Sequence, residues 1–182
     1  MRRLISLLMM SLLLAACAGR QPRALVELPP LRLSPASLGT TLALQQQLQF
    51  TFGSHQRALD ALLEVDDRQV RLAVQAMGQT GVRLQWDGAT LTQQRAPWLP
   101  PQVRAGRVLD DLQFALWPTA AIAAALPAGW QVDDDGQQRT LGRNGTTWLR
   151  LQRHADGSLE LENRAEGYAL RIESADMSTQ EP

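Results

Sequence analysis

The sequence TLALQQQLQFTFGSHQRALDALLEV, residues 41–65, indicates the fold class, because two alternating segments flank one short turn. In residues 41–52 apolar side chains alternate with glutamine and threonine. A period of two is typical of a strand buried on one face. Gly53-Ser54 predicts a turn, and the alternation returns in residues 59–65. Two such segments this close together predict an antiparallel strand pair.

The same pattern continues toward the C-terminus. Residues 70–76 and 82–86 alternate again, and a shorter segment surrounds Leu91. Polar or glycine-containing turns separate these segments, so residues 41–91 predict a meander of five strands.

A helical period follows a proline cluster at Pro97, Pro100 and Pro101. In residues 104–116 the apolar side chains form one stripe, which predicts an amphipathic helix with Asp110 and Asp111 facing away from that stripe and from the core. Residues 119–126 are rich in alanine and predict a second helix.

A second meander is expected in the remaining chain. Four alternating segments are separated by Asn144-Gly145, Asp156-Gly157 and Glu166-Gly167: residues 138–143, 146–154, 158–163 and 168–173. Asn-Gly and Asp-Gly pairs are strong hairpin signals. With strands resuming after Trp130, the sequence predicts an α+β fold with a single antiparallel sheet of nine or ten strands. A sheet this large tends to curl, so we expect an open half-barrel with the helical pair covering its concave face, over residues 40–174, followed by a flexible tail at 175–182.

The N-terminus has the pattern of an export signal. Arg2 and Arg3 precede an apolar run that ends at Ala16, and this run is shorter than the roughly 20 residues that span a bilayer. The small residues before Cys17 resemble the lipobox of bacterial lipoproteins. This predicts a signal peptide at 1–16 and lipid attachment at Cys17; the alternative is an ordinary signal peptide with a chance cysteine. The lone cysteine has no disulfide partner.

The segment after Cys17 is rich in proline and has no regular period. Residues 17–39 therefore predict an extended tether. In the lipoprotein pattern, an aspartate directly after the cysteine favours retention in the inner membrane. The residue here is Ala18, so the resemblance implies a lipid anchor at the periplasmic face of the outer membrane.

Charge and side-chain chemistry argue against several functions. The chain has 18 arginines and 18 acidic residues, and removal of residues 1–16 takes away two of the arginines, which leaves a slight negative charge. No basic patch occurs, so nucleic acid is not an expected partner. His55 and His154 are the only histidines, and neither lies near a nucleophile motif. No metal-ligand spacing or phosphate-binding glycine loop occurs. We therefore expect no enzyme activity, no metal and no cofactor.

The order of elements resembles the LolA/LolB group of lipoprotein carriers, and LolB in particular because it is itself a lipoprotein. The most specific local match is LAVQAMGQT at residues 72–80, which resembles a LolB strand ending in a protruding hairpin. Leu126-Pro127 and TWLRL at residues 147–151 are similar to the second half of the family. The chain also resembles small bacterial lipoproteins encoded among fatty-acid and aryl-polyene synthesis genes.

This resemblance implies an apolar cavity that accepts acyl chains or another long apolar cargo and helps to deliver it to the outer membrane. The implied partners are lipidated cargo and a periplasmic donor similar to LolA, and we expect a monomer. The candidate ligand-binding residues are the inward apolar side chains: Leu48, Phe50, Phe52, Leu63, Leu72, Val74, Leu84, Trp86, Leu112, Leu116 and Trp148. The alternative is that each belongs to an ordinary closed core.

Met77 differs from its neighbours because its position in the alternation is opposite to that of Leu72 and Val74, beside a glycine turn. It is therefore expected to be exposed, and a flexible apolar side chain at a loop tip suits contact with a membrane. The alternative is an isolated apolar residue on the surface. An accessory lipoprotein that binds a protein partner without a lipid ligand is the second functional hypothesis.

Overall fold

A computed structural model describes residues 26–99 and 103–177, and its strands form two consecutive groups. The first group comprises β1 (Leu42–Phe52), β2 (His55–Val65), β3 (Val70–Ala76), β4 (Gln79–Trp86) and β5 (Leu91–Arg95). The second group comprises β6 (Trp130–Asp134), β7 (Gln138–Arg143), β8 (Thr146–Arg153), β9 (Leu159–Asn163) and β10 (Tyr168–Asp176).

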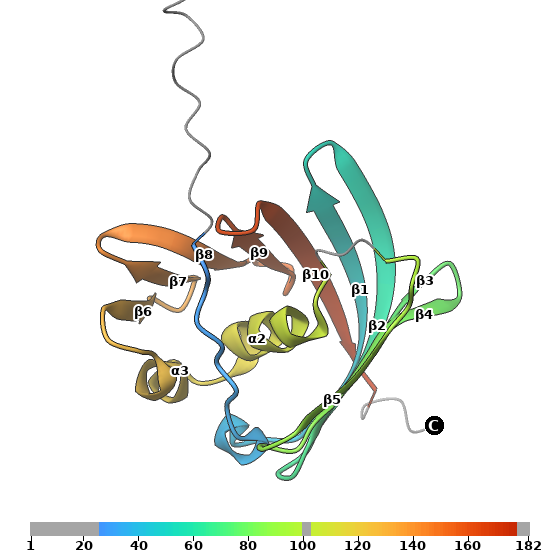
Figure 1. The fold of residues 1–182 in the computed structure, drawn as a ribbon, viewed down its shortest axis with the longest axis horizontal. Coiled ribbons are helices and arrows are strands. Elements are labelled where there is room, and N and C mark those ends of the chain that lie inside the picture. Colours follow the sequence, from blue (N-terminus) through green and yellow to red (C-terminus); the bar gives the residue numbers. More distant parts are fainter. Residues whose placement is uncertain (1–25, 100–102, 178–182) are drawn as a thin grey trace, which may run out of the picture.

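The ten strands form a single antiparallel sheet in the order β5-β4-β3-β2-β1-β10-β9-β8-β7-β6. Pairing of β1 with β10, from Leu44 opposite Asp176 to Phe52 opposite Tyr168, joins the two meanders. Strands β5 and β6 form the two edges, and the sheet curls without closing (Figure 1). The predicted α+β fold with one open antiparallel sheet is confirmed.

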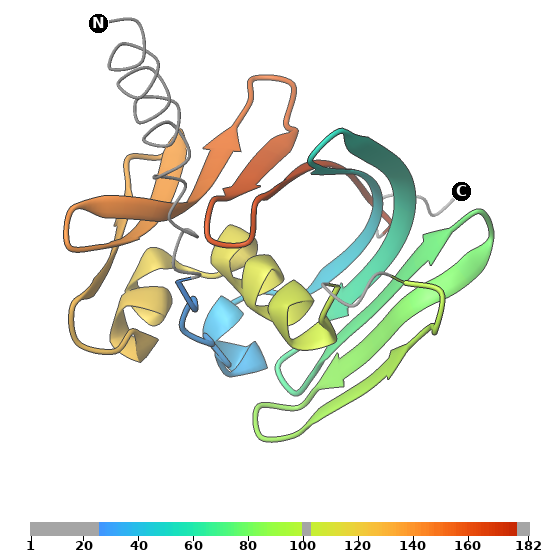
Figure 2. The same cartoon turned by 45° about the horizontal axis from the view of Figure 1, so that its top comes forward.

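The helices α2 (Ala105–Leu116) and α3 (Thr119–Ala125) connect the two edges of the sheet. Because β5 and β6 are consecutive strands in the sequence but lie at opposite edges, the chain between them must pass from one edge of the sheet to the other. Helix α2 lies within the curl of the sheet, and α3 follows it toward β6 (Figures 1 and 2). Neither helix has the length and apolar character to span a membrane, a statement that covers the described residues.

Strand β2 begins four residues before the predicted segment. His55, Gln56, Arg57 and Ala58 pair with the last residues of β1 up to Phe52. Their side chains are exposed and mostly polar, so no apolar alternation marked them as a strand. Backbone pairing alone extends the hairpin, and it carries Arg57 onto the inner face of the sheet.

Residues 26–39 are not a free tether in the structure, contrary to expectation. They form a strap that packs on α2, with Leu28, Leu31, Leu33 and Leu38 in the core and a short 3₁₀ helix at Pro35–Leu38. Apolar burial outweighs the flexibility that the prolines indicated. The signal segment, Cys17 and Ala18 lie outside the described residues.

The strap is also hydrogen bonded to α2. The backbone N–H of Leu31 donates to Asp110 Oδ1 at 3.1 Å. Gln113 accepts from the N–H of Leu33 at 3.0 Å and donates to its carbonyl at 2.8 Å. The strap therefore holds the helix in place through hydrogen bonds as well as apolar packing.

The C-terminal strand is longer than predicted. Ala175 and Asp176, assigned to a flexible tail, pair with Gln45 and Leu44 of β1 and so belong to the sheet. Residues 178–182 lie outside the described part of the chain.

Candidate functional site

A cavity of about 410 Å³ lies between the concave face of the sheet and α2. Its walls come from strands β1 to β4, β9 and β10, from α2, and from the segments before that helix. They are mainly apolar: Leu48, Phe50, Phe52, Leu59, Leu72, Val74, Ala76, Val82, Trp98, Leu99, Val103, Val108, Leu112, Ala115, Leu116, Leu159, Leu161, Leu170 and Ile172. The remaining lining residues, apart from Gly81, are polar or charged: Gln46, His55, Arg57, Gln75, Arg104, Arg107, Asp111, Glu166 and Tyr168.

Most of the residues predicted from sequence come together around this cavity. Seven of the eleven line it: Leu48, Phe50, Phe52, Leu72, Val74, Leu112 and Leu116. They come from β1, β3 and α2. The alternation in the strands and the apolar stripe of the helix therefore converge on one space.

The other four predicted residues do not line the cavity. Leu63 and Leu84 are packed in the core, and Trp86 is covered by the strap, donating its Nε1–H to the Leu33 carbonyl at 2.7 Å. Trp148 neighbours the fully buried Leu149 on β8. Trp148 is partly buried and packs against the hydrophobic core, at a point where the register between β7 and β8 shifts.

The rim of the cavity exposes aromatic and apolar side chains. Phe52 and Trp98 line the cavity yet are 40% and 48% exposed. A Cβ atom on Gly81 would lie 3.2 Å from the Trp98 ring, so the glycine allows the ring to pack against β4. Met77, next to the lining residue Ala76, is 93% exposed. The predicted exposure of Met77 is confirmed.

A buried polar cluster, formed by Arg107, Asp111, Asn163 and Tyr168, fastens α2 to β9 and β10. Arg107 Nε donates to Asp111 at 2.9 Å. The Tyr168 hydroxyl donates to Asp111 and accepts from the Asn163 side chain. Burial raises the pKa of Asp111 to about 6, although Arg107 opposes the shift. Burial also raises the pKa of Tyr168. The hydroxyl therefore stays protonated and can donate to the carboxylate.

The prediction that Asp110 and Asp111 face away from the core is wrong, because both are buried. The helix has protein on two sides: the sheet meets one face and the strap the other. Asp110 accepts from the strap and lies 3.4 Å from Arg32 and 3.8 Å from Arg107. These partners offset the cost of burying the carboxylates.

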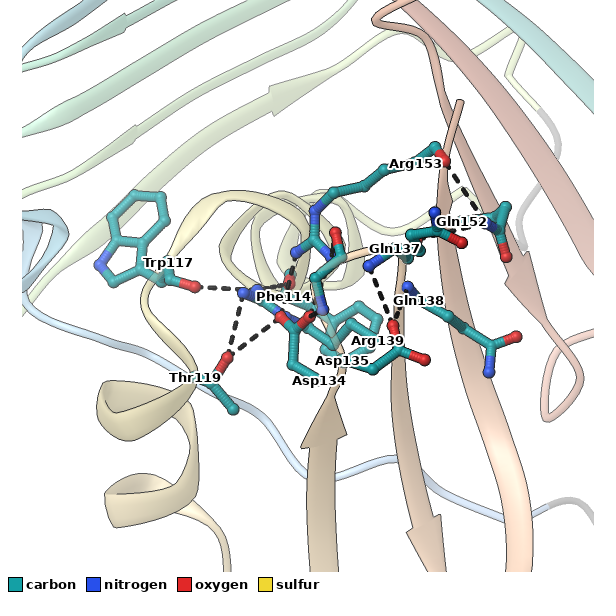
Figure 3. A network of polar contacts seen from close by, with 11 residues as sticks. Phe114, Trp117, Thr119, Asp134, Asp135, Gln137, Gln138, Arg139, Gln152 and Arg153 are labelled. Atoms are coloured by element: carbon teal, nitrogen blue, oxygen red, sulfur yellow. Dashed lines mark hydrogen bonds and ion pairs between the residues drawn. The ribbon is translucent and has the colours of Figure 1, made fainter. Parts of the chain in front are cut away.

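A second polar network, centred on Arg139 of β7, holds the C-terminal end of α2 (Figure 3). Arg139 Nη1 donates to the carbonyl oxygens of Phe114 and Trp117, at 2.5 and 2.8 Å. Its Nε donates to Asp134 at 2.6 Å, and Asp134 also pairs with Arg153 at 3.0 Å. A cation is favourable at a helix C-terminus. The network and the buried cluster together fix the helical wall of the cavity.

Residues 43–176 match the model of a protein family described as a protein of unknown function (DUF3261). The chain belongs to this family. The matched range contains every strand of the sheet apart from Leu42, and it includes α2 and α3. The DUF3261 match begins after the strap. No protein with a curated description matches the chain.

Several cavity residues were not predicted from sequence. Arg57, Trp98 and Tyr168 line the cavity, but Arg57 lies in a polar segment and Trp98 in a proline-rich loop. Only Tyr168 carried a signal, because it starts a predicted strand directly after Glu166-Gly167. Among the described residues, no three His, Cys, Asp or Glu side chains are grouped as ligands of a metal ion.

Proposed function

We propose that this chain is an outer-membrane lipoprotein, anchored by a lipid on Cys17, that binds the acyl chain of a cargo molecule in its cavity. The observation that carries the proposal is the apolar cavity of about 410 Å³ between the sheet and α2. This volume is within the range of roughly 300 to 1,000 Å³ that is usual for ligand sites. Lipidated molecules and other long apolar compounds are the cargo class that such a space accepts.

The chemistry of the walls suits an acyl chain. Burial of apolar surface is favourable and non-directional, and each methylene removed from water contributes about 0.8 kcal/mol. A chain therefore needs no specific hydrogen bonds along its length. The walls formed by Leu48, Leu72 and Leu112 offer this kind of surface.

Delivery to a membrane is supported by the rim. Phe52, Met77 and Trp98 are large apolar side chains exposed at or beside the cavity mouth. Exposed apolar groups gathered at one place are typical of interaction surfaces. We propose that this rim contacts the outer membrane while cargo leaves the cavity, and that a periplasmic carrier similar to LolA is the donor.

A second candidate is an accessory lipoprotein that binds a protein partner. The supporting observation is that β5 and β6 each have one edge without a neighbouring strand among the described residues. Such edges can accept an additional strand from another chain. In this case the cavity would remain without a lipid ligand.

A fluorescence titration separates the two candidates. Trp98 is the one tryptophan among the described residues that lines the cavity, so a long-chain acyl ligand is expected to shift its emission. The chain without residues 1–17 would be titrated with a fatty acid, and the Trp98→Phe protein provides the matched control. A shift in the first protein that is absent from the second supports acyl binding. A flat titration in both favours the accessory function.

A further inference from the structure

Arg57 places a positive charge at the rim of an otherwise apolar part of the cavity. It lies on β2, directly opposite Phe50 in the pairing with β1. Its position in the alternation is that of Leu59 and Ala61, so its side chain is on the inner face, and it lines the cavity. Within the described residues, Arg57 therefore combines an inward position with access to solvent.

Among the residues that the structure describes, none forms an ion pair with Arg57. The other two arginines of the cavity wall form ion pairs: Arg104 lies 2.7 Å from Glu166, and Arg107 lies 2.9 Å from Asp111. For Arg57, no carboxylate of the described residues lies within ion-pair distance. A guanidinium offers up to five N–H donors, in a geometry that matches carboxylate and phosphate.

We infer that the ligand is a single-chain amphiphile with an anionic head, a carboxylate or a phosphate. Its chain lies among the apolar side chains between the sheet and α2, and its head pairs with Arg57 at the rim. A volume of about 410 Å³ is in the lower half of the usual range, which favours one chain over two. This inference rests on the proposed function and adds the chemical class of the ligand.

The test uses the full chain reconstituted in phosphatidylcholine vesicles and three photoactivatable probes with identical sixteen-carbon chains, ending in a carboxylate, a phosphate or an alcohol. Labelling of cavity peptides is measured by mass spectrometry, and each anionic probe is expressed as a ratio to the alcohol. The ratio removes differences in how much chain enters the cavity. Arg57→Gln is compared with Arg83→Gln as a matched control. Arg83 lies on β4 between the buried Val82 and Leu84, so it is on the outer face and exposed.

The acid-to-alcohol or phosphate-to-alcohol ratio is expected to fall about threefold in Arg57→Gln, the size expected for an exposed ion pair. It should stay unchanged in Arg83→Gln and recover partly in Arg57→Lys. The probe with the larger loss identifies the head group. If both anion-to-alcohol ratios are the same in Arg57→Gln as in Arg83→Gln, the role of Arg57 is overturned but acyl binding remains intact. Absence of labelling by every probe overturns both this inference and the proposed function.

Discussion

Replacement of Arg139 by methionine is expected to destabilise the fold by releasing the C-terminal end of α2. Arg139 is 5% exposed and donates to the carbonyl oxygens of Phe114 and Trp117. Methionine keeps much of the side-chain volume but supplies no donor. The two carbonyls lose these bonds, and Asp134 loses the closer of its two arginine partners.

The magnitude follows from these contacts. Removal of one partner from a buried ion pair costs about 3–5 kcal/mol. Asp134 keeps Arg153 at 3.0 Å, so we expect a value near the lower end, about 3 kcal/mol. The free energy of unfolding would be measured by urea denaturation, with Arg143→Met as control. Arg143 is also on β7, but it is exposed and its guanidinium lies 6.0 Å from the Trp130 ring centroid.

The control is expected to lose less than about 1 kcal/mol, the range of exposed cation–π contacts. A loss below about 1 kcal/mol in Arg139→Met as well would refute the view that this network holds the helical wall. The wall would then depend on apolar packing alone.

Three further predictions concern the cavity, its rim and the buried cluster. Leu48→Trp should fill the cavity and reduce acyl labelling severalfold, whereas Gln49→Trp, on the opposite face of β1, should not; equal labelling would place the ligand elsewhere. Met77→Glu should leave the melting temperature unchanged and weaken transfer of bound acyl ligand to vesicles, and unchanged transfer would remove the rim from the mechanism. The pKa of Asp111 is raised from 3.8 to about 6 in the folded state, so protonation of this carboxyl stabilises the fold. The stabilisation is complete below about pH 4 and is lost as the pH rises through about 6, a change of about 3 kcal/mol in the free energy of unfolding. The free energy of unfolding measured at pH 4 and pH 7 should show this loss in the parent chain but not in Asp111→Asn. The same difference between the two pH values in both proteins would contradict the raised pKa of Asp111.

The sheet could be predicted from sequence because its alternation and turns are local signals. Asn144-Gly145 forms the expected turn between β7 and β8, with positive φ at both residues. Met77 and Gly78 do the same between β3 and β4, which agrees with the exposure expected for Met77. The predicted cavity residues of β1 and β3 do line the cavity, because the alternation identifies the inner face of each strand.

The errors share one physical cause, since each depends on contacts between distant segments. A helical stripe indicates one buried face, but it does not reveal that the strap buries Asp110 or that Tyr168 of β10 and Arg107 enclose Asp111. The apolar residues Leu28, Leu31 and Leu33 could have indicated the strap, but the prolines suggested a tether. Arg57 was missed because its strand segment is defined by pairing with β1 rather than by its own composition.

The central claim is that the cavity holds an acyl chain in the cell, and the most direct test is mass spectrometry of the small molecules bound to the natively purified full chain. The expected result is a single-chain anionic lipid in near-stoichiometric amount, strongly reduced in Leu48→Trp but retained in Gln49→Trp. Equal lipid content in the two tryptophan variants, or none in the parent chain, would contradict the claim.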